Sequence, residues 1–144
     1  MVNLTQNYAD DGSFAWSPDG ELIAFLSTRE YCPDETTPQE QDCRWSERDL
    51  YVMKRDGSEV QRIADFGVNH CGVVWWPDNK KLVYSVSCNL VDDNPTEIYI
   101  VDIEDGGKPV QLTDSSSVSV TLPYAYNSAP QPSADGLQIL FYSF

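Results

Sequence analysis

The sequence contains few residues with which an enzyme could do chemistry. Its single histidine, His70, stands beside Cys71, and a lone histidine next to a cysteine is more often packed or exposed than a ligand. The chain has no G-x-S-x-G nucleophile motif, no H-E-x-x-H zinc motif and no C-x-x-C pair. We therefore expect these residues to form no catalytic centre and to hold no cofactor.

Paired acidic residues are the other candidates for chemistry. Asp10-Asp11-Gly12 and Asp92-Asp93-Asn94 supply carboxylate and amide oxygens, which are the ligands that Ca²⁺ prefers. Neither stretch has the staggered spacing of a dedicated calcium-binding loop. We expect both to be solvated turns and predict no metal site.

Composition and charge narrow the class of protein. A chain of 144 residues with 41% hydrophobic residues suits one domain with a core of its own. The net charge of −14 disfavours nucleic acid and anionic membranes as partners, because both require clustered lysine and arginine. Such acidity keeps a secreted or surface protein soluble, and binding of cations or a basic partner is the alternative. No apolar run is long enough to predict a membrane span. We expect Met1–Thr5 to lead directly into a strand and not to belong to a signal peptide, so the chain is either cytosolic or a mature segment behind an added start methionine.

The elements that must position these residues follow from an internal repeat. The stretch FAWSPDGELIAFLS (14–27) alternates apolar residues, turns at Pro-Asp-Gly and alternates again, which predicts a β-hairpin. It recurs as VVWWPDNKKLVYSVS (73–87) and, more weakly, as APQPSADGLQILFYS (129–143). The turn residues Asp19, Asp78 and Asp135 lie 59 and 57 residues apart. The chain is therefore predicted to repeat one structural unit.

A second element accompanies the hairpin. It reads DLYVMKRDGSEVQRIAD at 49–65 and EIYIVDIEDGGKPVQLTD at 97–114, and VNLTQN (2–7) matches its end. Four short antiparallel strands per unit, without helical periodicity, predict an all-β chain built of propeller blades. We expect blades at about 2–60, 61–110 and 111–144 within one partial propeller (1–144), the last blade lacking its outer strand. The residues expected to pack between blades are Trp16, Trp76, Ile23, Phe25, Val83, Tyr84, Ile139 and Phe141.

The repeat resembles the TolB-type β-propeller repeat, whose hallmark is W-S-P-D-G-x-x-I-A-F-x-S followed by I-Y-V-M-x-x-D-G. WSPDGELIAFLS with LYVMKRDG matches it almost completely, and WPDNKKLVYSVS with IYIVDIEDGG matches it well. The third unit keeps only SADGLQILFYS, with Ala134 where proline is expected. The resemblance covers nearly the whole chain. It implies the propeller fold and, if it extends to TolB itself, periplasmic contacts between proteins of a cell-envelope complex.

All the long connections are predicted on one face of the blades. Connections in a propeller blade alternate between two faces, and the tight Asp-Gly turns all belong to one of them. The opposite face, here named the loop face, receives the segments 28–48, 89–95 and 115–128. Its candidate binding residues are Tyr31, Trp45, Tyr124, Tyr126, Asp92 and Asp93. Aromatic and polar side chains together suit protein or glycan recognition, and the alternative is that these rings only hold their own loops in place.

Two questions stay open at this level. The chain could be a non-catalytic recognition scaffold or the propeller fragment of a prolyl-oligopeptidase-like hydrolase, whose nucleophile lies on another domain.

The number of blades raises the second question. Three blades are too few for a ring, since propellers close with about four to eight. Two copies giving six blades, an open head-to-tail assembly, or a longer chain would each cover the apolar ends, where we expect Phe25, Phe141 and Tyr142 to be exposed.

The four cysteines predict a disulfide-bonded protein in the periplasm or outside the cell. Cys32 and Cys43 bracket the long acidic loop, and closing about ten residues contributes roughly 3 kcal/mol in the chain-entropy model. Cys71 and Cys88 flank the second hairpin, whose turn lies near their midpoint. Four buried free thiols in a cytosolic chain are the alternative.

Ellman's reagent tests this pairing directly. We expect unreduced, denatured protein to release no thiol signal, because all four sulfurs would be oxidised. Four titrating thiols would rule out the pairing, and the same sample titrated after reduction calibrates the assay.

Overall fold

The computed structural model describes residues 3–31, 48–64, 70–86, 95–104, 106–115 and 127–143. This part of the chain forms ten β-strands and contains no α-helix. The strands are β1 (Asp11–Trp16), β2 (Leu22–Ser27), β3 (Asp49–Lys54), β4 (Gln61–Ala64), β5 (His70–Trp75), β6 (Lys81–Val86), β7 (Glu97–Asp102), β8 (Val110–Gln111), β9 (Asn127–Pro132) and β10 (Ile139–Ser143). Within the described ranges, no helix is available that could cross a membrane.

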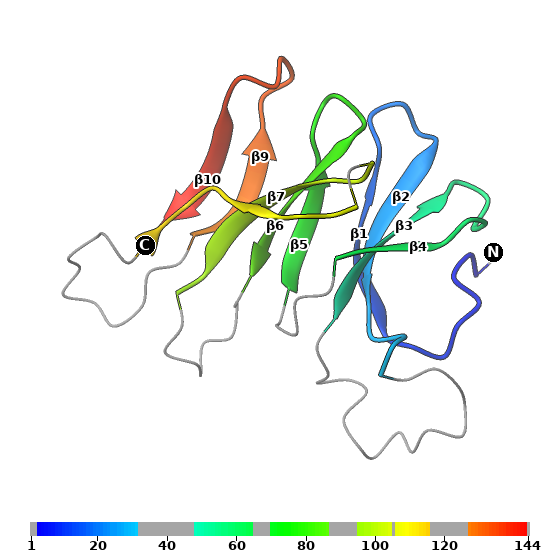
Figure 1. Cartoon of the computed structure of the whole chain (residues 1–144). Coiled ribbons are helices and arrows are strands. Elements are labelled where there is room, and N and C mark those ends of the chain that lie inside the picture. The colour runs from blue at the N-terminus through cyan, green and yellow to red at the C-terminus, as the bar shows by residue number, and fades with distance from the viewer. Residues whose placement is uncertain are drawn as a thin grey trace.

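The strands form three antiparallel sheets in chain order. Sheet one is β1-β2-β3-β4, sheet two is β5-β6-β7-β8, and sheet three is the pair β9-β10. Figure 1 shows the three sheets side by side, with the β1–β2, β5–β6 and β9–β10 hairpin turns all at the same end. The first and last sheets are not joined. The all-β propeller-segment architecture predicted from the repeat is confirmed.

The short strands pair differently from the expected order. The sequence placed each short strand at the start of the following blade, but β4 pairs with β3 and β8 pairs with β7. Tyr51 lies opposite Arg62, and Tyr99 lies opposite Gln111. The reason is local, because the tight turn after each third strand returns the chain beside that strand, which closes only a short loop. In the described residues, sheet three therefore has the first two strands of the unit.

Register identifies the equivalent residues of the three sheets. Trp16, Trp75 and Pro132 each end the first strand of their sheet and pair with the residue that follows the hairpin turn. The residue equivalent to Trp16 is therefore Trp75 and not Trp76, the tryptophan that was expected to pack between blades. Trp75 is the buried tryptophan, and its indole Nε1 donates to the carbonyl of Ala15 in sheet one at 3.0 Å.

The main core lies between sheets one and two. Sheet one contributes Ala24, Leu26, Leu50, Val52, Ile63 and Ala64, and sheet two contributes Val73, Trp75, Leu82, Tyr84 and Val101. A smaller cluster on the other side of sheet one contains Ile23, Phe25, Tyr51 and Met53. Alternate residues of β2 face opposite sides, as the period of a strand requires. Burial of large apolar side chains of this kind contributes about 1.5–3 kcal/mol each.

The predicted inter-blade residues have mixed outcomes. Burial is confirmed for Ile23, Phe25, Val83 and Tyr84, whereas Ile139 and Phe141 are only partly buried. Trp16 is 57% exposed, so its predicted packing is wrong. The expected exposure of Phe25 is wrong too, since Leu4 and the Arg29 guanidinium cover that ring. Trp76 lies partly buried beside the sheet-three turn, where a Cβ at Gly136 would be 2.9 Å from its Nε1.

The turn aspartates organise the hairpins as their sequence predicts. The Asp19 carboxylate accepts hydrogen bonds from the Ser17 hydroxyl at 2.6 Å and from the Glu21 amide at 3.0 Å. Asp135 has the same partners in sheet three, the Ser133 hydroxyl and the Leu137 amide. These bonds to the ionised form, first that from the serine hydroxyl, hold the pKa of each carboxyl below its ordinary value of 3.8.

This arrangement predicts an acid-sensitive contribution to stability. A carboxyl with a lowered pKa in the folded state stabilises the fold above its unfolded pKa, and the contribution disappears as the pH falls through the folded pKa. We expect an Asp19→Asn, Asp135→Asn double variant to lose less of its Tm than the wild type between about pH 4 and pH 2. Parallel Tm curves for the two proteins would contradict this role.

The structure does not test the cysteine pairings. Cys32, Cys43 and Cys88 lie outside the described residues. Cys71 belongs to β5, where its backbone pairs with Ser85 of β6. Both disulfides therefore stay predictions.

Candidate functional site

Strand register defines the loop face. Asp11, Ser27 and Asp49 lie side by side at one end of sheet one, and His70, Val86 and Glu97 lie at the corresponding end of sheet two. In sheet three, Asn127 lies opposite Ser143 at this end. The connections after β2, β4, β6 and β8 all start or finish at these strand ends. The topology thus supports the prediction that the long connections share one face.

Only one predicted binding residue falls within the described part of the chain. Tyr31 is 41% exposed at the beginning of the connection that follows β2. The other five candidates lie outside the described residues, and their roles stay predictions: Trp45, Asp92, Asp93, Tyr124 and Tyr126.

Backbone hydrogen bonds fix the position of Tyr31. Its amide donates to the carbonyl of Thr28 at 2.9 Å, and Thr28 is fully buried. The Thr28 hydroxyl accepts from the amide of Asp10 at 3.0 Å, while the Thr28 amide donates to the Asp10 carbonyl at 3.2 Å. The backbone that carries the Tyr31 ring is therefore hydrogen-bonded to the end of sheet one.

Arg29 anchors the loop face of sheet one. Its guanidinium lies 4.8 Å from the centre of the Phe25 ring and 4.7 Å from that of Tyr51, which is the geometry of a cation–π contact. It also pairs with Asp11 at 3.4 Å and donates through Nε to the Ser27 hydroxyl at 3.0 Å. Arg29 joins the ends of β1, β2 and β3.

Two further arginines pair with acids beside it. Arg48 contacts Asp10, and Arg62 pairs with the fully buried Asp49 at 2.7 Å. The expectation of a solvated turn acid is wrong for Asp11, which begins β1 and is 16% exposed in its ion pair, whereas Asp10 remains 40% exposed beside Arg48. Among the described residues, no group of three or more metal-ligating side chains occurs.

The Tyr51 hydroxyl lies in the same cluster. It donates to a carboxylate oxygen of Glu30 at 3.2 Å. Burial raises the pKa of Tyr51 far above its ordinary value, and the negative charges of Glu30 and Asp49 raise it further. Tyr51 is therefore a neutral hydrogen-bond donor at physiological pH.

A second polar cluster joins the loop-face ends of sheets two and three. The buried Glu97 carboxylate accepts from the Thr113 hydroxyl, from the Ser115 amide at 2.7 Å and from the Asn127 side-chain amide at 3.3 Å. Asn127 also donates to the Ser115 hydroxyl at 2.8 Å, and its backbone amide donates to the Thr96 carbonyl at 3.0 Å. Each buried polar group thus has a partner, and the cluster holds β9 against sheet two.

Sequence reasoning missed both buried acids. Asp49 and Glu97 occupy the same position, the first residue of the third strand, in DLYVMK and EIYIVD. An acid repeated at the start of an apolar strand was the available signal. The described part of the loop face thus consists of paired charges, buried acids and aromatic rings joined by hydrogen bonds and ion pairs.

Comparisons with known proteins agree with this architecture. No family model matches the chain. The uncharacterised peptidase YuxL from Bacillus subtilis is 29% identical to this chain over 101 residues. The match covers 67% of this chain and 12% of YuxL. The chain therefore spans only about an eighth of this curated relative.

Solved structures give the fold. A TolB from Agrobacterium tumefaciens, itself described as putative, superposes with a TM-score of 0.68 and 21% identity over 98% of this chain and 40% of its own. TolB from Acinetobacter baumannii has a TM-score of 0.60 and 20% identity, over 90% of this chain and 26% of its own. An oligogalacturonate lyase in complex with manganese has a TM-score of 0.52 and 21% identity, over 88% of this chain and 28% of its own. The chain folds as a segment of a TolB-type β-propeller.

Proposed function

We propose that the chain is a non-catalytic scaffold whose loop face recognises a protein or a glycan. The observation that carries this proposal is the convergence of every long connection on one face, above a base fixed by the Arg29 and Glu97 clusters. Rigid sheets that display variable connections are a common arrangement for binding. The described residues supply no metal-ligating cluster, and the paired arginines are engaged by the protein itself.

Charge favours a partner with basic groups. The segment 28–48 contains six acids and three bases, and two of those bases, Arg29 and Arg48, pair with Asp10 and Asp11 of the neighbouring strand region. The loop connection therefore presents a net negative charge. Complementary charge on a partner speeds its association and selects against acidic surfaces.

We place this activity outside the cytoplasm. The proposal is supported by the likeness to TolB structures and by the predicted disulfides. A periplasmic protein partner is the form of the proposal that this likeness favours.

A second candidate function follows from the peptidase relative. The chain could be the propeller part of a prolyl-oligopeptidase-like hydrolase, in which the propeller screens substrate and another domain carries the nucleophile. The match to YuxL favours this possibility. A coding sequence that continues beyond Phe144 into a G-x-S-x-G motif would support it, whereas further propeller repeats would support the scaffold.

A four-site variant tests the loop face. Changing Tyr31, Trp45, Tyr124 and Tyr126 to alanine is expected to abolish retention of partners from an envelope extract, because these rings supply the apolar contact area. The unfolding midpoint should change little. A second arm with an array of purified glycans distinguishes a glycan ligand from a protein.

A matched variant on the opposite face serves as the control. It changes four exposed residues of the tight turns to alanine: Glu21, Arg55, Lys80 and Glu104. We expect it to bind like the wild type. If binding survives in the loop-face variant but is lost in the control, the binding site lies on the face of the tight turns and the proposal is wrong.

A further inference from the structure

Sheet one has an apolar face on the side away from sheet two, here named the front face (Phe14, Trp16, Ile23, Phe25 and Met53). Ile23, Phe25 and Met53 are buried, and the part near β1 is uncovered. Phe14 is 76% exposed and Trp16 is 57% exposed, both on β1. A hollow of about 370 Å³ lies between these residues and the stretch Asn3–Thr5. Large exposed rings of this kind are typical of surfaces that contact another protein or a ligand.

Sheet two shows what covers the same face. Val73 and Trp75 hold the positions of Phe14 and Trp16, and both are buried against sheet one. Their contacts are the small and aliphatic side chains of Ala24 and other residues of the core. The Trp75 indole donates to the carbonyl of Ala15, the next-to-last residue of β1. The front face of sheet one therefore fits the first two strands of a neighbouring sheet.

The N-terminal stretch already takes the place of that neighbour's fourth strand. A Cβ at Gly57 would lie 2.6 Å from the carbonyl oxygen of Leu4, and a Cβ at Gly107 would lie 2.2 Å from the carbonyl oxygen of Ile63. Leu4 thus stands to sheet one as Ile63 of β4 stands to sheet two. Leu4 also packs on the Ile23 and Phe25 cluster. The front face therefore lacks the first three strands of such a neighbour, and the first two of these form its inner hairpin.

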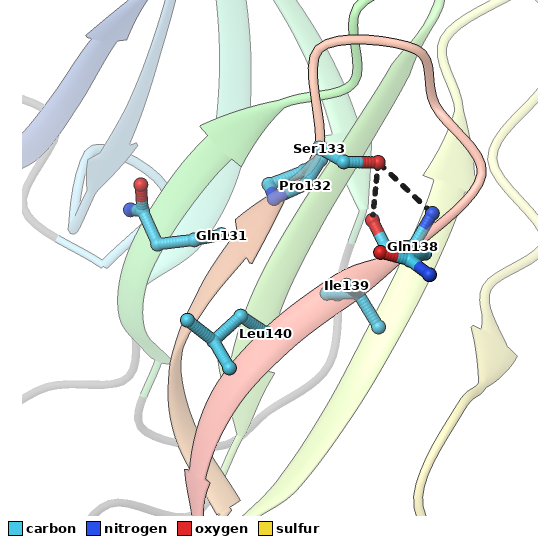
Figure 2. Close-up of a pocket in the computed structure, with 6 residues that line it drawn as sticks. All are labelled: Gln131, Pro132, Ser133, Gln138, Ile139 and Leu140. Atoms are coloured by element: carbon cyan, nitrogen blue, oxygen red, sulfur yellow. Dashed lines mark hydrogen bonds between the residues drawn. The ribbon is translucent and has the colours of Figure 1, made fainter.

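Sheet three is an inner pair of strands with an uncovered face. Its outward residues Leu140 and Tyr142, 75% and 65% exposed, hold the positions of Ala24 and Leu26, which pack on sheet two. Figure 2 shows Leu140 and Gln131 on the β10 and β9 strands of this hairpin, and Gln131 holds the position of Ala15. Residues 127–143 contain one charged side chain, Asp135, although the whole chain has a net charge of −14. The hairpin is suited to burial.

We propose that the β9–β10 hairpin of a second copy of this chain covers the front face. Leu140 and Tyr142 would pack on Phe14 and Trp16, and the Trp16 indole would donate to the Gln131 carbonyl, as Trp75 donates to Ala15. Two copies make this contact reciprocally and close a ring of six sheets, within the usual range for propellers. The contact lies on the sides of the sheets and is independent of the recognition proposed for the loop face.

Light scattering on the chain at several concentrations and salt levels tests the contact. We expect a molar mass of twice 16.2 kDa, with tighter association at high salt because screening weakens repulsion between two acidic copies. Leu140→Glu and Phe14→Glu should each abolish the dimer. Val110→Glu, a change at an exposed apolar residue on β8 outside both faces, should leave it intact. Trp16→Phe should weaken the dimer about 25-fold, because it removes one hydrogen bond at each of the two junctions and each is worth roughly fivefold.

Mixing the two defective variants distinguishes this contact from others. One junction of a mixed dimer joins the intact front face of Leu140→Glu to the intact hairpin of Phe14→Glu, so mixing should restore weak association. A monomeric wild type, with all proteins shown to be folded by their unfolding transitions, would overturn the proposal. So would dimers that survive Leu140→Glu, which would indicate two front faces in contact, or a mass that keeps rising with concentration, which would indicate an open chain.

Discussion

Replacing Gly107 with alanine is expected to lower the free energy of unfolding by about 3 kcal/mol. Gly107 has a φ of +71°, and its added Cβ would lie 2.2 Å from the carbonyl oxygen of Ile63. Neither backbone can move away freely, because Ile63 belongs to β4 and packs in the core. The substitution would therefore push the turn of sheet two away from sheet one.

The neighbouring glycine is a matched control. Gly106 has a φ of +70°, but nothing lies within 4 Å of the Cβ that alanine would add. Gly106→Ala should lower the free energy of unfolding by only about 1 kcal/mol, the cost of placing alanine in a left-handed backbone conformation. Urea unfolding of both variants measures the difference. Equal losses would show that the turn does not press on β4.

Removal of the Glu97 carboxylate is the second large expected effect. Glu97→Ala removes the shared acceptor of three donors: the partly buried Thr113 hydroxyl and Ser115 amide, and the buried Asn127 side-chain amide, which keeps its second bond to the Ser115 hydroxyl. The expected loss of stability is about 3 kcal/mol, because each unsatisfied buried group costs about 1–3 kcal/mol and water fills part of the space. The same change should loosen β9 from sheet two.

Urea unfolding and amide exchange of residues 127–143 measure these two consequences. Glu104→Ala is the control, because Glu104 is an exposed acid of the same sheet that pairs with Lys80 at 2.8 Å. It should change stability by less than about 1 kcal/mol. A Glu97 variant that unfolds like the Glu104 variant, with unchanged exchange in sheet three, would contradict the role of this cluster.

The sequence predicts the fold well because the fold is repetitive and local. Alternating apolar residues around Asp19, Asp78 and Asp135 define hairpins whose hydrogen bonds lie within a few residues. Such short-range chemistry is visible in a single sequence. The grouping of strands was less secure, since VQRIAD reads equally well as the end of one blade or the start of the next.

Contacts between distant residues could not be predicted. The ion pairs Arg29–Asp11 and Arg62–Asp49 each join residues from neighbouring strands or strand ends. The spacing of these residues in the sequence therefore does not predict either pair. The exposure of Trp16 has a different origin. Its residue type fits a buried position, as Trp75 shows, but the sheet that would cover it is not part of sheets one to three. The type of a residue thus indicates whether its side chain is suited to burial or to an ion pair, but it does not show which distant residue the side chain contacts.

Hydrogen–deuterium exchange of the chain, free and bound to a captured partner, tests most directly whether recognition takes place on the loop face. We expect binding to slow exchange in peptides from 28–48, 89–95 and 115–128 and to leave the tight hairpin turns on the opposite face unchanged. Slower exchange confined to those turns, with the three loop segments unaffected, would contradict recognition at the loop face.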